Sequence, residues 1–151
     1  MNIGIVGHEA AKFTPENEAS ALALISRLLP ADSVLVSGRS PLGGIDVWAE
    51  EVADRLGIPK LIHPPAKNSW DQGFRLRNLA IAHSSDIVHV IVVRTLPEAF
   101  KGLRFKLCYH CGTTAHVKSG ACWTARQAMK LGKPALWHLL PLLRKLEVPT
   151  P

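Results

Sequence analysis

Residues 34–46 have the sequence Val-Leu-Val-Ser-Gly-Arg-Ser-Pro-Leu-Gly-Gly-Ile-Asp. The apolar run 34–36 predicts a short buried strand, and the apolar periodicity that starts at Ile45 and stops before Gly57 predicts a helix. Glycines between a strand and a helix let backbone N–H groups approach a ligand, and the helix dipole favours an anion there. The stretch therefore predicts a strand, a Gly-rich anion-binding turn and a helix. A plain turn in which Asp46 satisfies the first N–H groups of the helix is the alternative.

The same alternation extends to both ends of the chain. Apolar runs predict further strands at 3–6, 60–63, 87–93 and 134–139, and capping residues and periodicity predict further helices at 15–29, 74–83 and 121–131. Continuously apolar strands that alternate with helices are typical of a parallel sheet covered on both faces. We therefore expect an α/β fold, a Rossmann-like three-layer sandwich with a mostly parallel sheet of about five strands. Residues 1–139 form the domain, and 140–151 form a basic tail bounded by prolines.

Composition narrows the class of protein. A chain of 151 residues with 47% hydrophobic and 20% charged residues is long and apolar enough for one folded domain. No apolar run approaches the roughly 20 residues that span a bilayer, and the N-terminus lacks the pattern of a signal peptide, so we expect a cytoplasmic protein with no membrane partner. In residues 76–151, Lys and Arg outnumber Asp and Glu by 11 to 3. A basic half suits a phosphate-bearing ligand or nucleic acid, although a solvated basic surface is the simpler explanation.

A second Gly turn, Lys118-Ser119-Gly120, precedes the helix predicted from residue 121. Ser119 can cap this helix or bind phosphate. Ligands of open α/β sheets gather at the carboxyl ends of the strands, so we expect the two Gly turns on neighbouring strand ends to form one crevice. His8 and Glu9 follow the first strand and face the same crevice. Glu9 is a candidate base or a ligand for a ribose hydroxyl, although loop residues of this kind are more often solvated.

All three cysteines lie close together, in the pattern Cys108-x2-Cys111-x4-His116-x5-Cys122. Thiolate and imidazole ligands at such spacings suit tetrahedral zinc, and the pattern is similar to a zinc knuckle with one extra residue before the last cysteine. Four protein ligands predict a structural metal. His110 is the alternative to His116, and three reduced thiols, or a reactive Cys122 near a helix N-terminus, are the alternatives to a metal. The surrounding segment, 94–119, is longer than an ordinary connection and is expected to be a functional insertion.

Several short motifs together resemble the SLOG superfamily, the Rossmann-like group that includes the Lonely Guy phosphoribohydrolases and the DNA-processing protein A family. They are Ser37-Gly38, Gly44-Ile45-Asp46-Val47-Trp48-Ala49, Gly57-Ile58-Pro59, Arg77-Asn78, Ser85-Asp86 and Gly132-Lys133-Pro134. The likeness covers roughly residues 2 to 139 without the insertion. It implies a domain that binds a nucleotide or a nucleotide-derived phosphorylated ligand, as a sensor, a carrier or an enzyme, and that dimerises. Without this resemblance, the local sequence alone favours Arg77 as a surface side chain on a solvated helix face.

One departure from the Lonely Guy pattern bears on catalysis. Those enzymes carry Pro-Gly-Gly-x-Gly-Thr-x-x-Glu at the last helix, whereas the matching stretch here is Lys118 to Arg126, with Thr124 near the motif threonine and no acid after it. The resemblance therefore favours ligand binding. A nucleotide N-glycosidase that uses Glu9 or Asp46 is the first alternative, and a nucleic-acid-binding protein is the second. The expected ligand site comprises Gly7, His8, Ser37, Gly38, Gly43, Gly44, Asp46, Arg77, Asn78, Ser119, Gly120 and Thr124.

Overall fold

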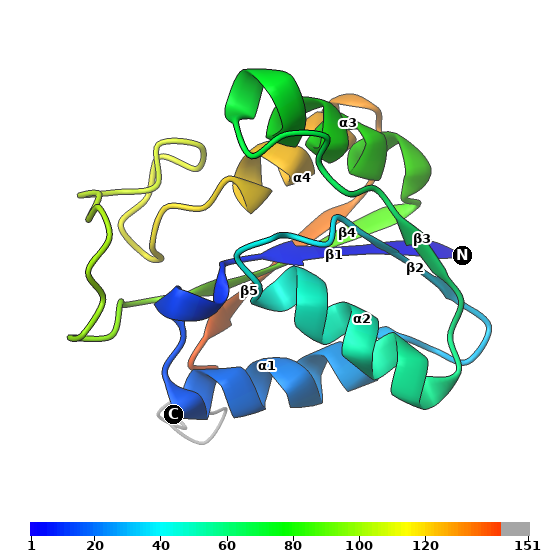
Figure 1. Cartoon of the computed structure of the whole chain (residues 1–151), viewed down its shortest axis with the longest axis horizontal. Helices are drawn as coiled ribbons and strands as arrows, with labels where there is room; N and C mark the ends of the chain where they lie inside the picture. The colour runs from blue at the N-terminus through cyan, green and yellow to red at the C-terminus, as the bar shows by residue number, and fades with distance from the viewer. Residues whose placement is uncertain (143–151) are drawn as a thin grey trace, which may run out of the picture.

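The computed structural model describes residues 1–142, which contain five strands and four α-helices (Figure 1). The strands are β1 (Asn2–Gly7), β2 (Val34–Ser37), β3 (Lys60–Ile62), β4 (Ile87–Val93) and β5 (Ala135–Leu140). The helices are α1 (Pro15–Leu28), α2 (Ile45–Leu56), α3 (Arg75–Ser84) and α4 (Ala121–Lys130). Each lies within one or two residues of its prediction. The predicted tail begins one residue too early, because Leu140 ends β5, and its residues 143–151 lie outside the described part of the chain.

The five strands form one parallel sheet in the order β3-β2-β1-β4-β5. Gly4 in β1 is in register with Val36 of β2 on one side and with Val88 of β4 on the other. The chain therefore builds outward from β1 in one direction, through β2 and β3, and then crosses to the other side of β1 for β4 and β5. This order confirms the predicted Rossmann-like α/β class and places a topological switch point between β1 and β4.

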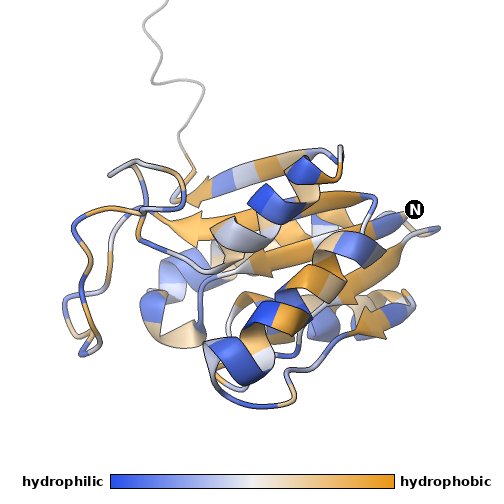
Figure 2. Ribbon diagram, turned by 90° about the horizontal axis from the view of Figure 1, so that it is seen from above, coloured by the Kyte–Doolittle hydropathy of each residue, from blue (hydrophilic) through white to orange (hydrophobic). Residues whose placement is uncertain are grey.

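Helices cover both faces of the sheet, α1 and α2 on one face and α3 and α4 on the other (Figure 1). The two cores are separate. Ile25 of α1 and Val52 of α2 pack with Ile5 of β1, whereas Ile81 of α3 and Ala125 of α4 pack with Val90 of β4. Figure 2 shows that the strands are mostly hydrophobic, whereas the helices carry both hydrophilic and hydrophobic residues. Because side chains alternate along a strand, β4 contributes Ile91 to the first core and its neighbours to the second.

Local signals explain most helix ends. The Thr14 hydroxyl accepts a hydrogen bond from the Asn17 N–H at 3.1 Å and Pro15 opens α1, as an N-cap and a first-position proline should. Gly57 ends α2 in the left-handed conformation, with φ 70°. The helix predicted from residue 74 starts differently, because a π-helical turn, η2 (Trp70–Phe74), precedes α3. A short 3-10 turn, η1 (Ala10–Lys12), follows β1 and was not predicted.

The predicted insertion lies between β4 and α4 and contains no named helix or strand among residues 94–120. It extends from the end of the sheet as a series of loops (yellow-green in Figure 1). Within this insertion, Cys108 and Thr113 form an isolated antiparallel β-bridge. Within residues 1–142, no helix is both long and apolar enough to cross a membrane.

Candidate ligand cleft and metal centre

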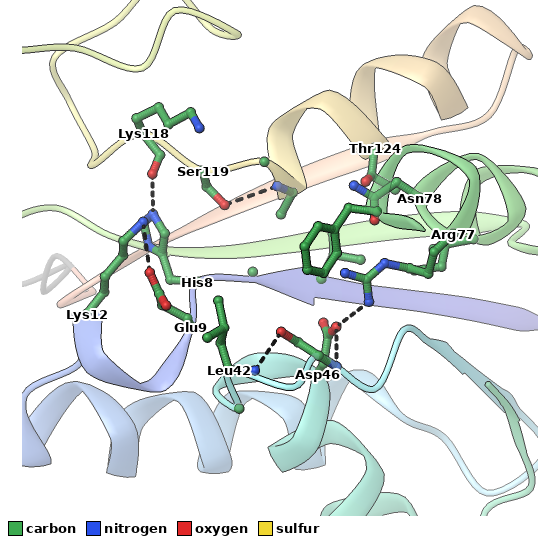
Figure 3. A pocket seen from close by; sticks show the side chains of 18 of the residues that line it. His8, Glu9, Lys12, Leu42, Asp46, Arg77, Asn78, Lys118, Ser119 and Thr124 are labelled. Carbon is green, nitrogen blue, oxygen red and sulfur yellow. Dashed lines mark hydrogen bonds and ion pairs between the residues drawn. The ribbon is translucent and has the colours of Figure 1, made fainter. Parts of the chain in front are cut away.

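A cleft of about 300 Å³ opens at the carboxyl ends of β1, β2 and β4 (Figure 3). Gly7 and His8 form its floor at the end of β1, and the first turns of α2 and α4 face each other across it. The sequence predicted that the two Gly turns lie on neighbouring strand ends. This prediction was wrong, because β1 lies between β2 and β4. The cleft occupies the switch point of the sheet, where open α/β folds bind ligands.

The turn before α2 is held against the end of β1. Gly43 and Gly44 have φ 72° and 82°, a backbone conformation that glycine adopts without a steric cost. The N–H of Ile45 donates to the carbonyl oxygen of His8 at 3.1 Å. A Cβ at Gly44 would collide with the backbone of His8 and Ala10. This close approach explains the second glycine and fixes where α2 begins.

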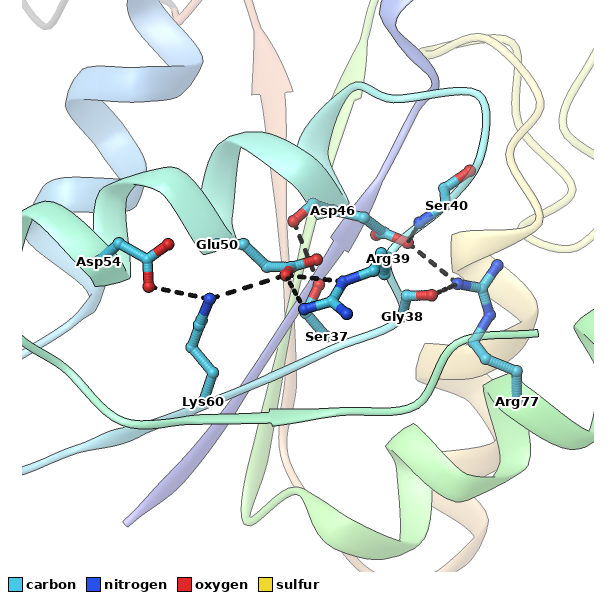
Figure 4. Close-up of polar contacts among 9 residues, drawn as sticks. All are labelled: Ser37, Gly38, Arg39, Ser40, Asp46, Glu50, Asp54, Lys60 and Arg77. Carbon is cyan, nitrogen blue, oxygen red and sulfur yellow. Dashed lines mark hydrogen bonds and ion pairs between the residues drawn. The ribbon is translucent and has the colours of Figure 1, made fainter. Parts of the chain in front are cut away.

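Asp46 and Arg77 form a buried ion pair beside the cleft, with side chains that are 9% and 8% exposed (Figure 4). The Arg77 Nη1 lies 3.1 Å from the Asp46 Oδ2 and also donates to the Gly38 carbonyl oxygen. The Ser40 N–H donates to the same carboxylate at 3.2 Å. Asp46 therefore turns away from the start of α2 and does not cap it, and Arg77 is not a solvated surface residue. The roles expected for these two side chains were wrong because each has a distant partner that the local sequence does not show.

Burial raises the pKa of Asp46 to about 6, against the opposing attraction of Arg77. Burial also lowers the pKa of Arg77, which Asp46 partly offsets. The carboxylate is charged at neutral pH and becomes neutral only in mildly acidic solution. It therefore holds the guanidinium in place under ordinary conditions.

A second group of charges ties the turn to the neighbouring strands (Figure 4). Arg39, with φ 46°, donates to Glu50 Oε1 from both Nε and Nη2, and Lys60 of β3 lies 2.8 Å from Asp54. The Ser37 hydroxyl donates to the Asp46 carbonyl oxygen at 3.3 Å. These contacts connect β2, α2 and β3, so they support the cleft without lining it.

His8 connects three segments of the chain through its ring. Its ring is 2% exposed, its Nδ1 accepts a hydrogen bond from the Val93 N–H at 3.0 Å, and its Nε2 donates to the carbonyl oxygens of Val117 and Lys118. Burial, with the nearby Lys12 charge, lowers its pKa to about 3. The neutral ring therefore joins the ends of β1 and β4 to the segment that enters α4.

Lysines mark one end of the cleft. The Lys12 ammonium lies 3.6 Å from Glu9, and burial lowers the pKa of Lys12 although Glu9 opposes the shift. Glu9, a candidate base from the sequence, is thus engaged in an ion pair. The Lys118 ammonium lies at the outer rim, 4.9 Å from the centre of the Phe105 ring. The cleft therefore presents cationic groups at the end nearest the insertion.

The first turn of α4 brings an unpartnered hydroxyl into the cleft. Thr124 is 1% exposed, lines the cleft, and its Oγ1 has no hydrogen-bond partner among the described residues. Figure 3 shows it beside Asn78, across from Arg77. The Ser119 hydroxyl accepts a hydrogen bond from the Ala121 N–H at 3.1 Å and so satisfies the first N–H group of α4, although Gly120 is the N-cap residue. Gly120 has φ −63° and an open space where a Cβ would stand, so its conformation does not require glycine.

The structure brings four predicted metal ligands together. One ligand atom from each of Cys108, Cys111, His116 and Cys122 lies within 4.8 Å of all the others, and this group can hold a metal ion. No cysteine is in a disulfide. His110 is not part of the group and packs against Tyr109, with ring centres 4.6 Å apart. Of the two histidines left open by the sequence, the geometry selects His116.

The surroundings of these four residues suit a bound cation. His116 Nδ1 donates to the Val117 carbonyl oxygen at 2.8 Å, which leaves its Nε2 as a buried atom without a partner. Such a hydrogen bond fixes the ring tautomer and orients the other nitrogen toward a metal. The Trp137 Nε1 donates to the Cys122 sulfur at 3.4 Å. Burial alone would raise the pKa of the Cys108 thiol, but hydrogen bonds from nearby backbone N–H groups outweigh it and lower this pKa.

Most residues of the expected ligand site line the cleft. Those that do are Gly7, His8, Gly43, Asp46, Arg77, Asn78, Ser119, Gly120 and Thr124, whereas Ser37, Gly38 and Gly44 do not line it. The sequence did not single out Lys12, Leu42, Trp70 or Phe74, which also line it. Trp70 and Phe74 belong to the unpredicted turn η2, and Lys12 to the unpredicted turn η1. The sequence offered one signal for these residues: Lys12 follows the end of a predicted strand, and Trp70 and Phe74 lie in the connection after another.

Comparison of the chain with protein-family models, curated proteins and solved structures finds no match. The fold and the two sites therefore define the class: a parallel α/β protein with a cleft at its switch point and a Cys3His group beside it.

Proposed function

We propose that this protein binds a phosphorylated nucleotide or nucleotide-derived ligand in the cleft at the switch point. The observation that carries the proposal is the Thr124 hydroxyl, which is buried in the cleft wall without a partner. A buried hydroxyl that makes no hydrogen bond costs about 1–3 kcal/mol, and native proteins carry few of them. A ligand oxygen at the start of α4 would supply the missing partner.

The charges favour an anionic ligand. The N-termini of α2 and α4 both face the cleft, and the dipole of a helix attracts phosphate to its N-terminus. The first N–H groups of α4 already bond to Ser119 and Gly120, so the dipole rather than free N–H groups favours the anion at this helix. Lys12 and Lys118 lie at the same end as the α4 turn. Asp46 does not cancel this charge, because Arg77 already neutralises it. These features support a phosphate position between the lysines and the start of α4.

Aromatic side chains favour a ligand that also carries a ring. Trp70 is 41% exposed and lines the cleft with Phe74. Trp70 packs against Trp123 of α4 in a T-shaped contact with 4.8 Å between ring centres, which holds Trp70 in place while part of its surface stays open. A nucleobase stacks well on such a surface. Phosphate at one end and an aromatic wall at another match the parts of a nucleotide.

Calorimetric titration of the wild-type protein with AMP, GMP, ADP-ribose and inorganic phosphate tests the proposal. We expect binding of at least one nucleotide, weaker binding of phosphate alone, and a loss of affinity of about fivefold or more in Thr124→Val, which removes only the hydroxyl hydrogen bond. Thr95→Val, at an exposed position outside the cleft, is the matched control and should bind as the wild type does. No heat of binding for any of these compounds at millimolar concentration would refute the proposal.

We further propose that the Cys3His group holds a structural zinc ion. Three thiolates and one imidazole in a closed set of four suit tetrahedral zinc and leave no position open for substrate. Metal analysis of protein purified without chelator should find about one zinc per chain. Cys111→Ser and His116→Ala should each lower that content, and His110→Ala, the control at the neighbouring histidine, should not. Full zinc content in Cys111→Ser would refute this ligand set.

Membership of the SLOG superfamily is proposed on the sequence motifs and agrees with a parallel sheet whose cleft contains Arg77 and Asn78. Catalysis is a second candidate function, favoured by one observation: the pKa of Asp46 is raised by burial to about 6, which suits a general acid or base near neutral pH. An N-glycosidase would release free base from a nucleoside monophosphate, and Asp46→Asn would abolish the release. Absence of free base at high protein concentration would exclude this activity for the compounds tested.

A further inference from the structure

A second surface lies on the insertion and meets the cleft only at Lys118. We call it the insertion face and define it as residues 100–110 together with Lys118. Four large apolar side chains of this face are exposed: Leu103 (74%), Phe105 (43%), Leu107 (41%) and Tyr109 (59%). Large apolar side chains that gather on one exposed segment mark a binding surface more often than a passive one.

The aromatic rings of this face are arranged around one cation. The centres of the Phe105 and Tyr109 rings are 6.0 Å apart, and His110 continues the group at 4.6 Å from Tyr109. The Lys118 ammonium lies 4.9 Å from the centre of the Phe105 ring and 5.2 Å from that of Tyr109. A cation over a ring face contributes about 0.5–1 kcal/mol at an exposed site, so Lys118 helps hold both rings in one place.

The insertion face is strongly basic. Lys101 and Lys106 are exposed on it, and Glu98 is the one acidic residue between Arg94 and Lys118. Arg104 is held in place because its Nη2 donates to three backbone carbonyl oxygens, those of Pro97, Glu98 and Phe100. Cations that alternate along the chain with rings and aliphatic side chains can follow a phosphate backbone while the rings contact its bases.

The Cys3His group is built into this face. Tyr109 lies between two of its members, Cys108 and Cys111. The Cys108 N–H donates to the Thr113 carbonyl oxygen at 2.9 Å, and the Gly112 N–H donates to the Cys108 carbonyl oxygen at 2.8 Å. The turn that presents Tyr109 is thus fixed by its own hydrogen bonds and by two residues of the buried cluster. A rigid platform loses less entropy when a partner binds.

We propose that the insertion face binds single-stranded nucleic acid, with unpaired bases on Tyr109 and Phe105 and phosphates at Lys101, Lys106 and Lys118. Bases in a duplex are stacked on one another and are not open to these rings, whereas unpaired bases are. The positive charge is complementary to a phosphate backbone. Apart from Lys118, which lines the cleft as well, the residues of this face lie outside the cleft, so this function is distinct from binding of a small ligand there.

Fluorescence anisotropy with labelled oligo(dT) and oligo(rU) of about 12 nucleotides, a length within the usual site size, tests the proposal. We expect binding that weakens steeply with salt, and a loss of affinity of roughly 5- to 100-fold for Tyr109→Ala and for Phe105→Ala, as expected for one stacked base. A double variant, Lys101→Glu with Lys106→Glu, should weaken binding and reduce the slope of log affinity against log salt by about 1–2.

The controls separate this surface from the rest of the protein. Lys130→Glu changes an exposed lysine at the far end of α4, and Leu136→Ala an exposed leucine on β5; both should bind as the wild type does. The Tyr109 variant must retain its metal content, which shows that the insertion is still folded. Thr124→Val should leave oligonucleotide binding unchanged, so failure here and failure of the cleft ligand are distinguishable.

Three results would overturn the proposal. A duplex of the same length that binds as tightly as the single strand would rule out base stacking. Full affinity of Tyr109→Ala and Phe105→Ala would place the binding site elsewhere. Binding of the protein to vesicles of anionic phospholipid, with no binding to either oligonucleotide, would assign the exposed leucines and lysines to a membrane surface.

Discussion

Replacing Gly44 with alanine tests whether the turn before α2 is locked against the end of β1. Gly44 has φ 82° and ψ −142°, a conformation close to the region that glycine alone adopts. A Cβ at this position would lie closer than 3.0 Å to backbone atoms of His8, Glu9 and Ala10. Backbone atoms cannot rotate away as the end of a side chain can. The turn would therefore have to move off β1 to admit the methyl group.

Its neighbour Gly43 provides a matched control. Gly43 also has a positive φ, 72°, but a Cβ there would meet only the Ala10 Cβ, at 3.5 Å, which is an ordinary contact. Gly43→Ala therefore adds only backbone strain, about 1–2 kcal/mol. Gly44→Ala adds strain of about 1–3 kcal/mol and an overpacking cost of similar size, about 4 kcal/mol together. For a domain with a typical stability of about 5–15 kcal/mol, this difference is easy to measure.

Urea unfolding of the wild type and the two variants gives the free energies directly. We expect Gly44→Ala to lose roughly two to four times as much stability as Gly43→Ala, with similar denaturant slopes for all three proteins. Gly57→Ala, with φ 70° and open space around its Cβ, should behave like Gly43→Ala. If Gly44→Ala is no less stable than the two controls, the turn does not pack on β1 and the α2 wall of the cleft is not fixed as described.

Three further predictions concern titration and the metal centre. The pKa of Asp46 is raised to about 6, so the folded protein holds that proton more tightly than the unfolded chain does and loses stability as pH rises through about 4 to 6. In urea titrations between pH 4 and 7, the wild type should lose roughly 2 kcal/mol of unfolding free energy relative to Asp46→Asn. Parallel pH profiles for the two proteins would contradict this. The pKa of His8 is lowered to about 3, so the protein loses unfolding free energy as pH falls below the ordinary histidine pKa near 6.5, by roughly 2 kcal/mol at pH 5. The His8 ring signals in NMR spectra should not titrate between pH 5 and 8. Removing metal with a chelator should lower the thermal unfolding midpoint of the wild type and of His110→Ala but change that of Cys108→Ser much less; equal shifts in all three would mean that the chelator acts elsewhere.

The strands and helices were predictable because their signals are local. The apolar run of β4, the Thr14-Pro15 start of α1 and Gly57 after α2 each specify one element from its own residues. The turn η2 was missed because its five residues, Trp-Asp-Gln-Gly-Phe, show no helical periodicity and are stabilised by contacts such as the close approach of Gly73 to the backbone of Lys67.

The candidate sites were predictable to different degrees for the same reason. The metal ligands follow one another within a short segment, so their spacing alone indicates the cluster. The pairing of Arg77 with Asp46 and the contact of His8 with Lys118 join residues far apart in the chain, and no local pattern contains them. The open Thr124 hydroxyl is a property of the packed helix rather than of the sequence. The residue types of the cleft were therefore largely predictable, but not their partners.

The segment from His116 to Cys122 belongs to both sites at once. His116 and Cys122 are members of the Cys3His group, and Lys118, Ser119 and Gly120 between them line the cleft. Two equilibria that share one segment are thermodynamically linked, and linkage is reciprocal. If a metal orders this segment and thereby strengthens binding in the cleft, a ligand in the cleft must strengthen metal binding by the same free energy. A cell that depletes either the metal or the ligand would then lower the occupancy of the other site as well.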